Sequence, residues 1–176
     1  QPNYPFTNDK KPWNEEAFVV AVEEENEDEA AAMIRGAASA GLTYRDIEPA
    51  FSRAALAHYQ DFGHAAIYVL KVGELIGHLG DEIMVPASLA LMRMLVFASR
   101  EELIPGFREY ANQLGEWTGT GSDPVDWKDF KGLSVKRAMA RASESSANPL
   151  ALYDALLAAN AWNLLQFDEK LQHHTG

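Results

Sequence analysis

Apolar residues recur at helical spacing along most of this chain, and that pattern limits the fold more than any other feature. Ala30, Met33, Ile34 and Ala37 share one face of an expected helix, and the stretch 87–98 is apolar almost all round. We therefore predict an all-α fold, a single domain of six to seven helices packed as an irregular bundle. The stretch 17–22 is compatible with either a short strand or the start of a helix.

Capping residues and glycines give the expected boundaries of the first helices. Asn26 follows an acidic run and is a candidate cap, because acidic residues are favourable in the first turn of a helix. A cation-binding patch is the alternative interpretation of this run. That helix should stop at Gly41, and Thr43 should cap a short turn to Ile47. Pro49 suits the first position of the next helix.

The remaining segments are expected to be helices joined by short connections. Gly63 should break the chain before a helix over 64–79, and Pro86 fits an early turn of the helix that follows. The segment 118–124 is a loop without the pattern of a phosphate-binding site. The other predicted segments are a helix after Gly106 to Leu114, a turn at 127–132, and helices over 134–143 and 149–167.

Two parts of the chain differ in character. Residues 1–16 contain three prolines and no apolar run, so we expect an extended N-terminal arm. Residues 17–176 form the predicted helical domain. The chain of 176 residues suits one domain of this size.

Charge and cysteine content exclude several classes of function. The chain has 26 acidic and 15 basic residues, a net charge of −11, which argues against nucleic acid or an anionic membrane as a partner. It has no cysteine, which excludes disulfides, thiolate nucleophiles and cysteine-ligated clusters. No stretch approaches the roughly 18 apolar residues of a membrane span. We expect a cytoplasmic protein.

Three histidines lie close together in the sequence and are candidates for chemistry. His64, Lys71 and His78 are each seven residues apart, so they project from roughly the same face of one helix. Seven residues span roughly 10 Å along a helix axis, so His64 and His78 cannot share an ion. Lys71 would bind a metal only after losing its charge, for example as a carbamate. His58 precedes the break at Gly63 and could fold back toward His64. Purely structural roles for all of these residues remain open.

Arg93 interrupts an otherwise apolar helix. Its guanidinium is expected to pair with Glu74 or Glu82, or else to face a pocket as a clamp for an anion or carbonyl group. Tyr68 follows His64 by one turn and so would lie beside it.

Two segments resemble the questin oxidase-like family. They are His58–Lys71, which contains Asp-Phe-Gly-His followed by Ile-Tyr and Lys, and Arg93–Pro105. The order of the segments is similar to the C-terminal half of that family. The resemblance implies part of a non-haem oxygenase that oxidises or opens the ring of a polycyclic aromatic, quinone-type substrate, in some cases with NADPH as reductant.

The resemblance also implies site residues and partners. An iron ion, or another transition metal, would be held by His64, by carboxylated Lys71 and by His58, with Tyr68 and Arg93 against the small aromatic substrate. No catalytic residue is assigned. Family members are longer, so the implied partner is a second chain that carries the missing N-terminal half with further histidines. The alternatives are a non-catalytic helical interaction module, with a homo-oligomer as one form of assembly, and a metal-free bundle that binds a small molecule.

Overall fold

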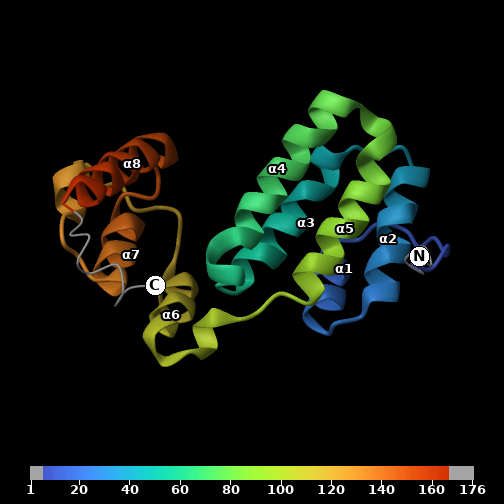
Figure 1. Ribbon diagram of the computed structural model, residues 1–176, viewed down its shortest axis with the longest axis horizontal. Coiled ribbons are helices and arrows are strands. Elements are labelled where there is room, and N and C mark those ends of the chain that lie inside the picture. Colours follow the sequence, from blue (N-terminus) through green and yellow to red (C-terminus); the bar gives the residue numbers. More distant parts are fainter. Residues whose placement is uncertain (1–5, 167–176) are drawn as a thin grey trace. The chain divides into compact units, whose positions relative to one another are not determined.

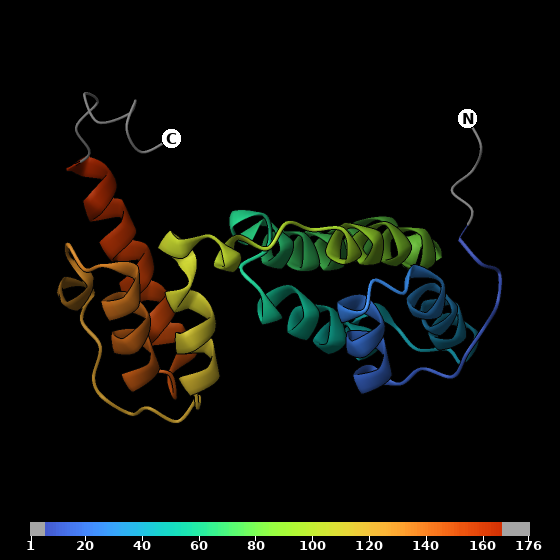
Figure 2. The ribbon, with the colours of Figure 1, turned by 90° about the horizontal axis from the view of Figure 1, so that it is seen from below.

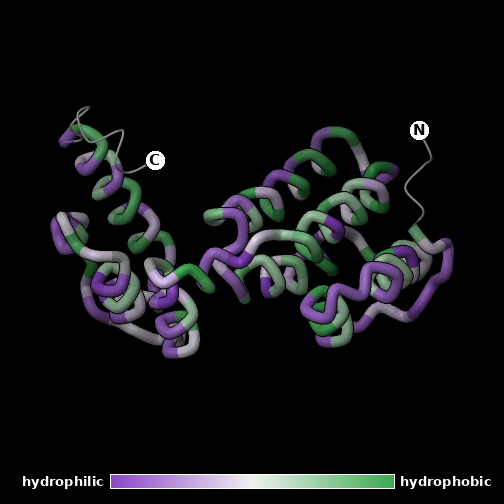
Figure 3. Tube along the Cα trace, turned by 60° about the horizontal axis from the view of Figure 1, so that its bottom comes forward, coloured by the Kyte–Doolittle hydropathy of each residue, from purple (hydrophilic) through white to green (hydrophobic). Residues whose placement is uncertain are grey.

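The computed structural model describes residues 6–166, which contain eight α-helices and no strand (Figure 1). The prediction of an all-α fold is therefore confirmed. The chain divides into two compact units, Gln1–Arg108 and Glu109–Gly176. Each unit encloses its own cluster of buried apolar side chains. In both units hydrophobic and hydrophilic residues alternate along the helices, as amphipathic packing requires (Figure 3).

The first unit contains five helices in two layers. They are α1 (Glu15–Glu23), α2 (Glu27–Ser39), α3 (Tyr44–Ala57), α4 (His64–Leu79) and α5 (Met84–Val96). Figure 2 shows α4 and α5 side by side over α1, α2 and α3. Phe18, Phe51 and Met92 come from different helices and are completely buried where the layers meet. The rings of Phe18 and Phe51 pack with their centroids 4.7 Å apart.

Side-chain caps fix the starts of the first helices. The Asn14 side chain accepts a hydrogen bond from the Ala17 backbone N–H at 2.8 Å, so 17–22 belongs to α1 and is not a strand. Asn26 accepts from the Glu29 N–H at 3.2 Å, which confirms its predicted capping role. Thr43 and Asp46 form a reciprocal capping box at the start of α3.

Pro49 does not start a helix, and this prediction was wrong. A single helix, α3, runs from Tyr44 to Ala57 with Pro49 inside it. The Pro49 ring is exposed, and the buried face formed by Ile47, Phe51 and Ala54 holds the helix together across the proline. Tertiary packing therefore outweighs the lost backbone donor.

Residues 6–14, before α1, have no regular secondary structure but are anchored to the helices. The Lys11 N–H donates to the Ala32 carbonyl at 3.0 Å, and Arg35 Nε donates to the Thr7 carbonyl at 2.7 Å. The Trp13 ring lies 5.0 Å from that of Phe18. The helix α1 begins at Glu15, one residue before the predicted end of the arm at residue 16.

The second unit contains α6 (Glu109–Glu116), a 3₁₀-helix (Trp127–Phe130), α7 (Val135–Glu144) and α8 (Pro149–Leu165). Its buried cluster is small and is formed by Phe130, Ala142, Leu152, Ala155 and Ala159. The Lys131 ammonium lies over two indoles, those of Trp127 at 4.3 Å and Trp162 at 4.4 Å. The loop 118–124 has no regular secondary structure, as predicted.

None of the helices among residues 6–166 has both the length and the apolar character needed to cross a membrane.

Candidate functional site

The Asp-Phe-Gly-His motif forms a left-handed turn between α3 and α4. Asp61, Phe62 and Gly63 have φ angles of 47°, 52° and 89°, all in the left-handed region. This conformation is natural for glycine but costs about 1–2 kcal/mol for each of the other two residues. Gly63 donates its backbone N–H to the Gln60 carbonyl at 2.8 Å, and α4 begins at the next residue, His64. A strained turn of this kind indicates that surrounding contacts fix the backbone.

Those contacts come from the segment that follows α5. Asp61 Oδ1 accepts from the Ser99 N–H at 3.2 Å and from the Ser99 hydroxyl at 2.7 Å. The Glu101 carboxylate accepts from the Phe62 N–H at 3.1 Å, and Gln60 forms an isolated antiparallel bridge with Arg100. The two segments therefore hold each other through hydrogen bonds between residues far apart in the sequence.

Glu101 is buried in this network, with only 4% of its surface exposed. Burial raises the pKa of its carboxyl, but hydrogen bonds from the Ser99 hydroxyl, the Phe62 N–H and its own N–H outweigh burial and lower the pKa below its usual range. The ionised carboxylate is thus the form that the turn requires.

His58 lies between two carboxylates beside the same network. Its Nε2 is 2.8 Å from Glu23 Oε2, and its Nδ1 contacts Glu102 Oε1. Each ring nitrogen therefore lies against a carboxylate oxygen, and neither faces an open position that a metal could take. Arg100 reaches the same Glu23 oxygen at 3.3 Å, and the Tyr59 N–H donates to Glu102 at 2.9 Å. In this arrangement His58 does not fit the role of a metal ligand.

His64 is arranged differently. Its ring is exposed at the start of α4, and its Nδ1 donates to the Asp61 main-chain carbonyl. That bond fixes the tautomer in which Nε2 keeps its lone pair, as in most histidines that bind metals. The Tyr68 ring lies 6.2 Å away at an interplanar angle of 31°. His64 therefore fits a ligand role, and Tyr68 lies beside it as the sequence predicted.

Lys71 does not fit a ligand role as an ammonium. Its Nζ lies 2.7 Å from Glu74 Oε2, and more than half of its side chain is exposed. A carbamate at this position would repel the Glu74 carboxylate. His78, two turns further along α4, donates Nδ1 to the Glu74 carbonyl at 2.7 Å, so its Nε2 resembles that of His64.

Arg93 pairs with Glu27, the first residue of α2. The two partners proposed from the sequence, Glu74 and Glu82, were therefore not the residues that hold it. Its guanidinium also lies over the Phe97 ring at 5.4 Å and near the Phe6 ring at 6.0 Å. These contacts link α2 to α5 and give Arg93 a structural role in the first unit.

No group of three or more histidine, aspartate or glutamate side chains within residues 6–166 is arranged to hold a metal ion. Of the three predicted ligands, only His64 has a side-chain nitrogen that lies away from a carboxylate in the described part of the chain. A metal site at this turn would therefore need ligands beyond those that the described part of the chain brings together. The assignment of His64, Lys71 and His58 stays a prediction.

The sequence did not point to Glu23, Glu101 and Glu102. Glu23 belongs to an acidic run that is explained by helix ends, and the other two follow an apolar helix with no distinguishing pattern. Their positions depend on pairing across 35 to 44 residues.

A search with this sequence and structure found no matching family model, no matching curated protein and no matching solved structure.

Proposed function

We propose that this chain is a helical part of a non-haem oxygenase similar to the questin oxidase-like family, acting on a polycyclic aromatic, quinone-type substrate. The observation that carries the proposal is the environment of His64. The left-handed turn places its Nδ1–H on the Asp61 carbonyl and leaves Nε2 on the exposed side of the residue. Iron, when bound, would supply the activation of dioxygen and the reductant would be NADPH.

The surface around His64 supports an aromatic substrate. Four large apolar side chains are exposed on the side of α4 that carries His64: Ile67, Tyr68, Leu75 and Leu79. A flat apolar molecule could bury itself against this face, and the Tyr68 ring would stack on it beside the imidazole. The remaining metal ligands would come from a second chain or from residues outside 6–166.

Elemental analysis of the isolated protein, together with any chain that co-purifies with it, tests the proposal. We expect a transition metal near one per chain, reduced to background in His64→Ala. His78→Ala is the matched control, because this exposed histidine also donates Nδ1 to a main-chain carbonyl of its helix. Metal content that survives His64→Ala, or falls equally in both variants, would contradict the role of His64.

A non-catalytic helical interaction module is the second candidate. The exposed apolar residues of α4 favour it, because a contiguous apolar face often marks a protein interface. A metal-free preparation that is bound to a second chain would support this candidate over the oxygenase.

A further inference from the structure

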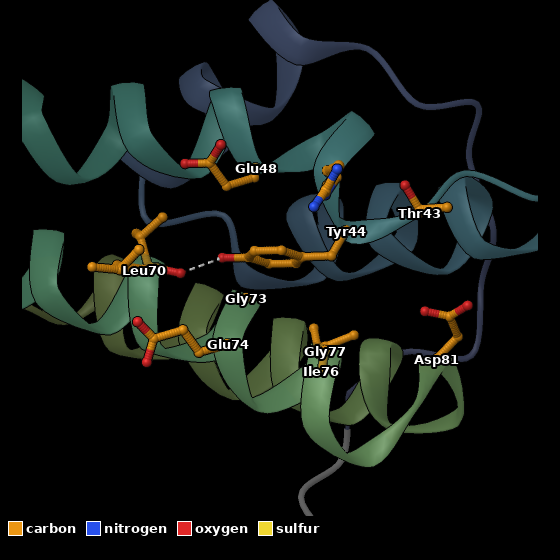
Figure 4. Close-up of a pocket in the computed structure, with 11 residues that line it drawn as sticks. Thr43, Tyr44, Glu48, Leu70, Gly73, Glu74, Ile76, Gly77 and Asp81 are labelled. Carbon is orange, nitrogen blue, oxygen red and sulfur yellow. Dashed lines mark hydrogen bonds between the residues drawn. The ribbon is translucent and has the colours of Figure 1, made fainter.

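A cavity of about 630 Å³ lies between the start of α3 and the middle of α4. Its volume falls within the range of roughly 300–1,000 Å³ that is typical of small-molecule sites. The wall is formed by Tyr44, Val69 and Ile76, which belong to the buried core, and the rim is formed by polar side chains (Figure 4). Gly73 follows His64 by nine residues, which is two and a half helical turns. The half turn places Gly73, and therefore the cavity, on the other side of α4 from His64.

Glycines on α4 create the space. A Cβ atom at Gly73 would lie 3.1 Å from the Tyr44 ring, so the missing side chain lets this ring pack directly on the helix. The Tyr44 hydroxyl donates to the Val69 carbonyl at 2.8 Å, which fixes the ring across the cavity. A Cβ at Gly77 would meet nothing within 4 Å, so the space beside it is open. Two glycines inside a helix cost stability, roughly 0.5–1 kcal/mol each relative to alanine.

The rim is predominantly negative. The lining contains the carboxylates of Glu48, Glu74 and Asp81 and the guanidinium of Arg45. Glu74 is already paired with Lys71 at 2.7 Å, which leaves Glu48 and Asp81 against Arg45. Figure 4 shows the Tyr44 ring between Glu48 of α3 and Glu74 of α4. Burial, and next the charge of Glu48, raise the pKa of the Tyr44 phenol above its usual range, so the Glu48 carboxylate acts on the interior of the cavity.

We propose that this cavity binds an organic monocation that carries an apolar ring. The apolar body would lie on the Tyr44 ring and against Val69 and Ile76. The ammonium group would lie at the rim beside Glu48, and Asp81 at the opposite end of the cavity would add to the negative potential. Charge complementarity selects this class over an anion, because Arg45 alone opposes Glu48 and Asp81, the two lining carboxylates that have no ion pair within residues 6–166. The proposal is independent of the oxygenase, because it uses neither His64 nor a metal.

Isothermal titration calorimetry of the full chain with three probes of matched shape tests the charge preference. The probes are 1-naphthylmethylammonium, neutral 1-naphthylmethanol and 1-naphthaleneacetate. We expect the cation to bind roughly tenfold more tightly than the neutral probe, and the preference to shrink at high salt. Tighter binding of the acetate would assign the cavity to an anion held by Arg45 and overturn the proposal. Equal affinity for all three probes, or no binding, would overturn it as well.

Two sets of variants locate the site. Gly77→Leu should abolish binding of the cation, since the new side chain enters open space, and leucine is favoured over glycine in a helix. Gly115→Leu in α6 is the matched control, a helical glycine that also has open space beside it, and it should bind like the wild type. The double variant Glu48→Gln with Asp81→Asn should weaken binding of the cation roughly tenfold and leave binding of the neutral probe unchanged. Unchanged cation binding in Gly77→Leu would place the site elsewhere.

Discussion

At the scale of single residues, Glu101 connects the protonation of one carboxyl to the strained turn before α4. Its folded-state pKa is lowered, so the stability it contributes is complete above the unfolded value, about 4.3, and is lost as the pH falls through the folded value. We expect Glu101→Gln to lower the free energy of unfolding by about 1–3 kcal/mol at pH 7, because Phe62 and Ser99 lose an ionised acceptor. Urea unfolding at pH 7 and pH 4 measures both effects.

The two pH values separate the role of charge from that of packing. The difference between wild type and Glu101→Gln should become smaller at pH 4, where the unfolded wild-type chain begins to bind a proton at Glu101 that the folded chain does not. Glu24→Gln, at an exposed position next to α1, is the control and should change stability by less than about 0.5 kcal/mol. A difference that is constant with pH would show that the charge of Glu101 does not stabilise the turn.

At the scale of helices, Pro49 and Pro86 provide a matched comparison. Pro49 lies in the interior of α3, where an N–H would bond to the Arg45 carbonyl, whereas Pro86 lies in the first turn of α5, where an N–H has no partner within the helix. We expect Pro49→Ala to raise the free energy of unfolding by about 1–3 kcal/mol, and Pro86→Ala to change it by less than about 1 kcal/mol. Thermal unfolding measures both changes. If the two substitutions changed the free energy of unfolding equally, the proline inside α3 would cost no more stability than the proline in the first turn of α5.

Helix ends could be predicted from the sequence because they depend on neighbouring residues. Asn26, Thr43 and Gly63 act within a few positions along the chain, and all three mark helix boundaries. The interior position of Pro49 could not be predicted, because it depends on the burial of a whole helix face. The carboxylates around His58 were missed for the same reason: Glu23 and Glu102 reach the ring from distant segments. Local patterns therefore predicted the all-α fold and singled out His58 and His64, but not the partners that decide what His58 can do.

At the scale of the whole molecule, the two units differ greatly in the size of their cores. The first unit buries side chains from five helices in one cluster, whereas, among the residues that the structure describes, the buried cluster of the second contains Phe130, Leu152 and three alanines. Because hydrophobic stabilisation grows with the apolar area removed from water, the second unit should open more readily. Hydrogen exchange of the full chain should therefore be slower in α2, α3 and α5 than in α7 and α8.

A core substitution in each unit tests whether they open separately. Phe130→Ala removes a ring that is 5% exposed and should cost about 2–4 kcal/mol, with faster exchange in α7 and α8 and unchanged exchange in α2 and α3. Phe51→Ala, in the core of the first unit, should speed exchange in α2 and α3. If Phe130→Ala accelerated exchange in every helix, the chain would unfold as one cooperative unit. If each substitution changed exchange only in its own unit, the effects of substitutions at His64 or Gly77 could be assigned to the first unit alone.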